Sequence, residues 1–354
     1  MGVCPSTEAQ KTALRIENDL RREKIVRKSY IKLLLLGSGE CGKSTLLKQM
    51  QIIHNNGFTM EELLSYRLLI QNHVLNLISS ILAFMQRSDI QLQDQTLETD
   101  LLKLLSSGQI SCGDEKTLQP TAELWKEIVM LWQDAGVQNA FSRKSEFLLF
   151  DNAEYFFNSI GRLEAADFVP TYEDLLRMRV QTAGIVQVRL KIKDYDFCVF
   201  DVGGQKSQRK KWIHLFDDIN AMIFIVALSD YDKMLREDSA VNRLQDSMEL
   251  FSITINNQYF ARTMIILFLN KKDLFCKQIQ STPITNVFAH YKGAQQYEEC
   301  VEYIREQFLS FNRNTKRQVP THETCATDTN QVQIVITNCT EKIIEKTLTA
   351  VGFT

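Results

Sequence analysis

One short glycine-rich segment constrains this chain more than any other feature. Residues Gly37-Ser38-Gly39-Glu40-Cys41-Gly42-Lys43-Ser44 match the pattern G-x-x-x-x-G-K-[ST]. The segment follows the apolar run Ile31–Leu36, typical of a buried parallel strand, and precedes a helical stretch that begins near Lys43. In that context backbone N–H groups and the helix dipole point at phosphate oxygens. We therefore predict an α/β fold that binds a nucleoside triphosphate, with Lys43 at the β- and γ-phosphates and the Ser44 hydroxyl on Mg²⁺.

The composition narrows the class of protein further. The chain has 354 residues, enough for two domains, and its 41 Lys+Arg nearly balance its 43 Asp+Glu, so we predict no nucleic-acid partner. Eight cysteines without a C-x-x-C pair indicate reduced thiols rather than a zinc site or a disulfide framework. The longest apolar run, 221–228, is far shorter than the roughly 20 residues of a spanning helix, and the polar N-terminus predicts no signal peptide.

The order of predicted elements indicates one α/β domain interrupted by a helical one. Residues 7–29 read as a charged helix whose basic face is either simply solvated or meets a membrane or partner. Residues 58–107 lack glycine and proline and place apolar side chains every three or four positions as far as Met85, which predicts a long amphipathic helix with a Thr59–Glu62 capping box. Further helical stretches, one of them at 97–105, extend to residue 177, and apolar strands alternating with helices follow. The predicted domains are an N-terminal helix at 1–29, an α/β domain at 30–57 and 178–354, and an inserted all-helical domain at 58–177.

Asn270-Lys271-Lys272-Asp273 is a candidate base-binding segment. It follows the apolar run 264–269, so it lies at the carboxyl end of a strand, where open α/β sheets bind ligands. The Asp273 carboxylate only accepts hydrogen bonds, and guanine presents two donors on one edge where adenine presents none. Together with Thr324-Cys325-Ala326-Thr327 downstream, this segment predicts GTP rather than ATP.

Two further segments are candidates for the γ-phosphate. In Asp201-Val202-Gly203-Gly204-Gln205, Asp201 can hold Mg²⁺ through water, a glycine backbone can approach the phosphate, and Gln205 can orient the attacking water. Upstream, Arg177-Met178-Arg179-Val180-Gln181-Thr182 joins the helical insert to the strands, and Thr182 suits a second hydroxyl ligand of the metal. Taken alone, the first segment could equally be a strand-ending turn, and the arginines a solvated helix end.

In this order, these segments resemble a heterotrimeric G-protein alpha subunit across essentially the whole chain, and the inhibitory-type branch most. The inserted helical domain and the R-x-R-V-x-T segment distinguish that family from small Ras-like GTPases. The resemblance implies a P-loop Ras-like GTPase domain with the helical insert, and slow hydrolysis of GTP to GDP as a timer. Cys41, Gln181 and Ala183 differ from the serine, lysine and threonine usual in the family, without removing a predicted ligand.

The resemblance also implies catalytic and metal-binding roles. Arg179 corresponds to the arginine that neutralises transition-state charge, and Gln205 to the glutamine that positions water. Ser44 and Thr182 are the implied protein ligands of Mg²⁺, with Asp201 acting through water.

The same resemblance implies the nucleotide contacts. Asn270 and Asp273 read guanine, the Lys271 stem covers the base, and the Ala326 N–H faces the guanine oxygen. The other implied contacts are Gly37, Ser38, Gly39, Glu40, Cys41, Gly42, Lys43, Thr45, Asp151, Asn152, Leu176, Arg177, Gly203 and Gly204.

Membrane-bound partners are implied as well. The family's beta-gamma dimer contacts the N-terminal helix and residues 206–214, a seven-helix receptor contacts the last helix at 330–349, and the effector is not identified. Met1-Gly2-Val3-Cys4-Pro5-Ser6 fits the pattern for myristate on Gly2, and Cys4 is a candidate for a second, palmitoyl anchor. The expected location is the inner leaflet, at the cytoplasmic face of the plasma membrane.

Two other functions stay open on the sequence. A GTP-binding scaffold that hydrolyses negligibly would not require both Arg179 and Gln205. A P-loop ATPase or small-molecule kinase would not require Asp273.

Overall fold

The computed structural model of the protein describes residues 30–94, 97, 120–147, 149–216, 218–235 and 237–351. The predicted helix at 7–29, the lipidation candidates Gly2 and Cys4, and all but the first residue of the helical stretch predicted at 97–105 lie outside these residues. Contacts divide the chain into two compact units. The sheet unit comprises the described residues of Met1–Asn56, Gln181–Asp232 and Arg243–Thr354, and the helical unit those of Gly57–Val180 and Lys233–Asn242.

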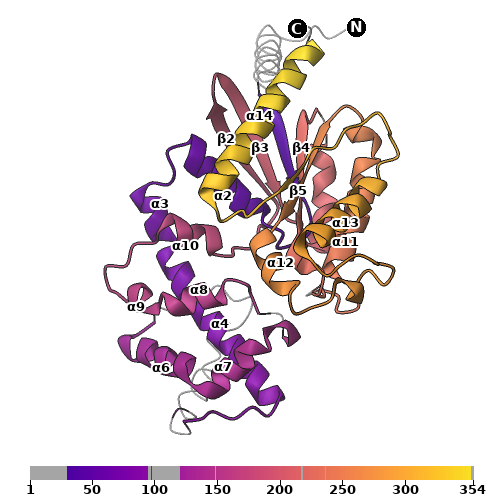
Figure 1. Ribbon diagram of the computed structural model, residues 1–354. Helices are drawn as coiled ribbons and strands as arrows, with labels where there is room; N and C mark the ends of the chain where they lie inside the picture. Colours follow the sequence, from indigo (N-terminus) through magenta and orange to yellow (C-terminus); the bar gives the residue numbers. More distant parts are fainter. Residues whose placement is uncertain are drawn as a thin grey trace, which may run out of the picture. The chain divides into compact units, whose positions relative to one another are not determined.

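A six-stranded sheet is the centre of the sheet unit (Figure 1). Its order is β2-β3-β1-β4-β5-β6, in which only β2 runs antiparallel to its neighbour. The strands are β1 (Ile31–Leu36), β2 (Ile185–Ile192), β3 (Tyr195–Val202), β4 (Ala221–Ala227), β5 (Met264–Asn270) and β6 (Thr321–Glu323). Because five strands are parallel, the loops after β1, β3, β5 and β6 emerge at one edge, which is where such sheets bind ligands.

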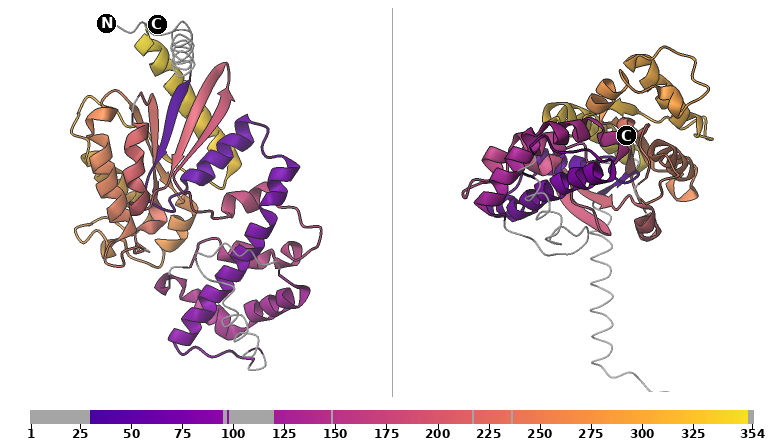
Figure 2. Two further views of the ribbon diagram at one scale, coloured as in Figure 1. Left: turned by 180° about the vertical axis from the view of Figure 1, so that it is seen from behind. Right: turned by 90° about the horizontal axis from the view of Figure 1, so that it is seen from below.

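Helices cover both faces of this sheet, as Figures 1 and 2 show. Leu33 and Leu35 of β1 pack in a buried cluster with α2 (Lys43–His54) and α14 (Thr329–Val351). The alternate residues of the strand pack on the other face in a cluster shared with α11 (Arg243–Ile255) and α13 (Tyr297–Ser310). This alternation explains why β1 is apolar almost throughout, as the sequence predicts for a strand buried on both faces. The remaining elements of the unit are η3 (Lys206–Leu215), η4 (Leu228–Asp230), η5 (Gln258–Phe260), α12 (Lys272–Gln278) and η6 (Ile284–Asn286).

The helical unit is built around α4 (Arg67–Arg87), whose residues Ile70, Val74, Ile78 and Ile81 are fully buried. The other helices are α3 (Met60–Ser65), α6 (Ala122–Gln133), α7 (Ala135–Ser142), η2 (Lys144–Glu146), α8 (Ala153–Asn158), α9 (Ile160–Leu163) and α10 (Tyr172–Arg177). By length and composition alone, Met60–Arg87 could cross a membrane, but 61% of its most apolar window is buried inside the unit, as in the core helix of a globular domain.

Two expectations need correction. The long helix expected from Thr59 as far as Met85 is divided in two. α3 ends at Ser65, and α4 runs from Arg67 to Arg87, just after the apolar spacing ends, and Asp89 then takes a left-handed φ of 52°. The predicted Thr59–Glu62 capping box is confirmed. The segment Lys233–Asn242 lies with the helical unit, although the expected boundaries put it in the α/β domain. An ion pair from Lys233 to Asp151 at 2.8 Å attaches it there.

Candidate nucleotide-binding site

The glycine-rich loop at 37–44 connects β1 to α2 as predicted. Gly42 takes a φ of +105° directly before α2, and a Cβ there would lie 2.3 Å from the side-chain nitrogen of Asn270, so only glycine fits. The Lys43 ammonium donates to the carbonyl oxygens of Ser38 at 2.6 Å and Gly37 at 3.0 Å. The lysine side chain therefore curls back over the loop, where a phosphate group would meet its positive charge.

Two hydroxyl groups and a carboxylate converge beside this loop. Ser44 Oγ lies 2.7 Å from Thr182 Oγ1, and it donates to Asp201 Oδ2. Thr182 Oγ1 lies 3.4 Å from the same carboxylate oxygen. Burial raises the pKa of the Asp201 carboxyl, while the charge of Lys43 opposes that shift. The other carboxylate oxygen, Oδ1, is buried and has no hydrogen-bond partner among the described residues.

The segment after β3 passes close to the loop. A Cβ on Gly204 would lie 2.4 Å from both the Lys43 ammonium and the Ser38 carbonyl oxygen, so the backbone can approach this closely only as glycine. A Cβ on Gly39 would lie 3.5 Å from the Gln205 side chain, which places Gln205 beside the loop. Gln181 Nε2 donates to Gln205 Oε1.

Asn270 links the base-binding segment to the glycine-rich loop. Its Nδ2 donates to the Cys41 carbonyl oxygen at 2.8 Å, and its Oδ1 accepts from the Ala326 N–H at 3.0 Å. Lys271 takes a left-handed φ of 60°, and Asp273 follows in the first turn of α12 with an exposed side chain. The two predicted base-binding segments and the glycine-rich loop therefore meet at the carboxyl edge of the sheet, within one hydrogen-bond network.

Arg243 supports the loop, and nothing in the sequence marks it. Its guanidinium donates to the Gly39 carbonyl oxygen at 3.0 Å and pairs with Glu40 at 3.1 Å and Asp230 at 3.2 Å. Glu40 needs such support because its φ is +64°. Only the fold brings Arg243 to Glu40, since the two residues lie 203 positions apart in the chain.

The other predicted contacts, Thr45 excepted, lie in the helical unit. Asn152 Nδ2 donates to the Arg177 carbonyl oxygen at 2.6 Å, and the Arg179 guanidinium lies over the Phe150 ring, 4.7 Å from its centre. Leu176 is buried in α10. Thr45, by contrast, lies in α2 of the sheet unit. The predicted contacts in the loops that follow the strands thus lie in the sheet unit, and the predicted contacts in the helical insert lie in the helical unit.

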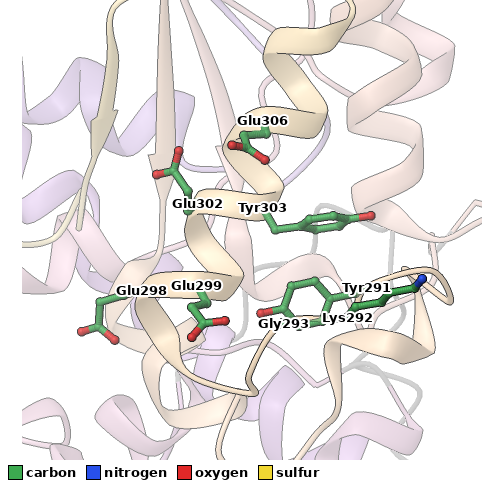
Figure 3. Close-up of a pocket in the computed structure, with 8 residues that line it drawn as sticks. All are labelled: Tyr291, Lys292, Gly293, Glu298, Glu299, Glu302, Tyr303 and Glu306. Carbon is green, nitrogen blue, oxygen red and sulfur yellow. The ribbon is translucent and has the colours of Figure 1, made fainter.

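A separate hollow of about 450 Å³ lies against α13, and it does not suit a nucleotide (Figure 3). Tyr291, Lys292 and Gly293 form one side, and Tyr303 projects from the helix between acidic residues. The carboxylates are Glu298, Glu299, Glu302 and Glu306. Their negative charge opposes phosphate binding, and no predicted nucleotide contact lines the hollow.

Comparison with known proteins decides the family. The profile of the G-protein alpha subunit family matches residues 10–343. The chain belongs to this family. It is 44% identical to the guanine nucleotide-binding protein alpha-17 subunit of Caenorhabditis elegans and 44% identical to the G(o) subunit alpha of Locusta migratoria, with 99% of both chains covered in each case. The G(o) subunit alpha of Lymnaea stagnalis is 42% identical, again with 99% of both chains covered.

Membership of this family establishes the predicted fold class and activity. This G-protein alpha subunit binds guanine nucleotide, transduces signals from receptors, and hydrolyses GTP to GDP. The ATPase and kinase alternatives are therefore excluded, and so is a scaffold without hydrolysis.

Proposed function

We propose that this G-protein alpha subunit binds GTP with Mg²⁺ at residues 37–44 and hydrolyses it slowly through Arg179 and Gln205, as a timed switch. The observation that supports this most directly is the convergence of Lys43, Ser44 and Asp201 with Thr182 at the carboxyl edge of the sheet. These are the charge and the oxygen ligands that a metal–triphosphate requires.

The residues present fit a magnesium ion. Mg²⁺ prefers oxygen ligands, keeps several waters, and usually takes only one or two protein groups together with phosphate oxygens. Ser44 and Thr182 would supply the hydroxyls, and the buried Oδ1 of Asp201 could accept from a metal-bound water. No group of three or more His, Cys, Asp or Glu side chains suited to a metal occurs in the described part of the chain. When bound, the ion would neutralise charge on the β- and γ-phosphates.

Charge explains what the side chains do. Negative charge spreads over the γ-phosphoryl oxygens in the transition state, and Lys43 and Arg179 neutralise it while Gln205 orients the attacking water. For this class as a whole, an arginine of this kind is worth about 10³–10⁵ in rate, a magnitude taken from the class and not from this structure. When the γ-phosphate leaves, Thr182 and Gly204 lose a partner and their loops relax.

Membership of the family also implies protein partners and a membrane, which we include in this proposal. G-protein alpha subunits are generally membrane-associated on the cytoplasmic side. We assign a beta-gamma dimer to the helix predicted at 7–29 and to η3, a seven-helix receptor to α14, and the inner leaflet to the lipids predicted on Gly2 and Cys4. The effector is left open, and no nucleic-acid partner is proposed.

Single-turnover hydrolysis tests the catalytic assignment. Arg179→Cys and Gln205→Leu should each slow phosphate release at least about a hundredfold, while the affinity for a non-hydrolysable GTP analogue stays within about twofold. Arg143→Cys is a matched control, because Arg143 also lies over a phenylalanine ring, that of Phe84 at 5.1 Å, in the helical unit. Parent-like rates in both test variants would refute the assignment.

A further inference from the structure

His73 is a polar residue at an apolar position of the helical unit. It lies on the buried face of α4, with 6% of its surface exposed. Its ring packs against Phe150 and Phe156, at centre-to-centre distances of 5.7 and 5.3 Å. Burying an imidazole among phenylalanines costs free energy unless the ring makes a hydrogen bond, so its partner matters.

That partner is Asn152. His73 Nε2 lies 3.2 Å from Asn152 Oδ1, and Asn152 Nδ2 donates to the Arg177 carbonyl oxygen at 2.6 Å. Because the amide nitrogen is used in that bond, the oxygen faces the ring, and His73 Nε2 must carry the proton. Burial lowers the pKa of His73 to about 4, so the ring is neutral at physiological pH and donates one defined hydrogen bond.

Helix α10 ends at Arg177, and Met178 continues the chain towards Arg179 as extended backbone. The last carbonyls of a helix lack partners within it, and Asn152 satisfies that of Arg177, the last residue of α10. Two residues later, the Arg179 guanidinium lies 4.7 Å from the centre of the Phe150 ring. The same short segment, 150–152, thus contacts both the backbone before Arg179 and its charged group.

We propose that His73, Asn152 and Phe150 are positioning residues for Arg179, which hold the backbone before this arginine and its guanidinium group in place. The inference rests on the catalytic role of Arg179 proposed above. A preorganised guanidinium loses little conformational entropy when charge develops on the phosphoryl group, whereas a mobile one loses more. His73 therefore acts on hydrolysis through Asn152, without contacting the nucleotide itself.

Single-turnover hydrolysis by the full chain distinguishes positioning from stability. His73→Leu should slow hydrolysis about tenfold or more, with affinity for the GTP analogue unchanged within about twofold. His73→Gln should restore the rate, because its Nε2–H can donate to Asn152 in place of the imidazole. Gln71→Leu is the matched control: Gln71 is a buried amide on the same helix, and it donates to the Leu163 carbonyl oxygen at 2.9 Å, away from Arg179.

A double variant distinguishes failure of the positioning role of His73 from failure of the proposed catalytic role of Arg179. In an Arg179→Cys background, His73→Leu should cause no further loss, because the group that it positions is gone. If Arg179→Cys itself keeps the parent rate, the proposed function fails. If Arg179→Cys is slow but His73→Leu is not, or if Gln71→Leu slows hydrolysis equally, the positioning proposal is overturned. Phe150→Leu, which keeps an apolar core residue, provides the test should His73→Leu not fold.

Discussion

The indole nitrogen of Trp212 donates a hydrogen bond to the carbonyl oxygen of Gly203 at 3.0 Å. Trp212 belongs to η3 and is 4% exposed, so a fluorescent side chain is buried next to the glycines assigned to the γ-phosphate.

This contact predicts an optical signal of the switch. Exchange of bound GDP for a non-hydrolysable GTP analogue with Mg²⁺ should change the intensity or wavelength of tryptophan emission, because the backbone at Gly203 moves when the γ-phosphate is present. Trp212→Phe should abolish the change. Trp132→Phe should preserve it, since Trp132 stacks on Phe157 in the helical unit. A signal that survives Trp212→Phe would contradict the prediction.

His73 predicts acid sensitivity of the helical unit. Burial lowers the pKa of His73 to about 4 in the folded protein, against an ordinary value of 6.5 for histidine, so the unfolded chain binds the proton more readily between these pH values. The free energy of unfolding should therefore fall as the pH drops from 6.5 towards 4, by about 2 kcal/mol at pH 5. Urea unfolding at pH 7 and pH 5 measures this. His73→Gln should remove that loss, whereas substitution of the exposed His290 by glutamine should not.

Base choice should follow the chemistry of one side chain. Asp273→Asn replaces one carboxylate oxygen by an N–H donor, which faces the N1–H and 2-amino donors of guanine unfavourably but matches the 2-oxo group of xanthine. Competition binding should show GTP affinity reduced at least about a hundredfold and xanthosine triphosphate affinity increased. Asp328→Asn, a nearby exposed carboxylate that accepts from the Gln331 N–H, should leave both unchanged. Unaltered base preference in the Asp273 variant would remove that residue from the site.

The lipid anchor is testable by fractionation of cells. Gly2→Ala replaces the glycine that the myristoylation pattern requires, and a single remaining acyl site binds membranes only marginally. The variant should move from the membrane to the soluble fraction, whereas Val3→Ala should stay with the membrane. Equal distribution of both variants would count against an anchor on Gly2.

Much of this protein can be predicted from local patterns. A glycine-rich turn between an apolar run and a helix specifies a phosphate loop, because steric freedom at Gly42 and the helix terminus are properties of adjacent residues. The capping box at Thr59 is likewise local. The three-residue strand β6 is too short to leave a pattern, and the break after Ser65 interrupts an apolar spacing that otherwise continues.

By itself, the sequence determined the family from the order of its motifs, and it predicted the phosphate loop and the residues proposed to read guanine, because each motif consists of residues within a few positions of one another. Only the tertiary structure decided which distant side chains support them. Arg243 reaches Glu40, and His73 reaches Arg177 through Asn152. Such pairs are joined by packing across the fold, and hydrogen bonds between residues far apart in the chain leave no periodic or spaced signal along it.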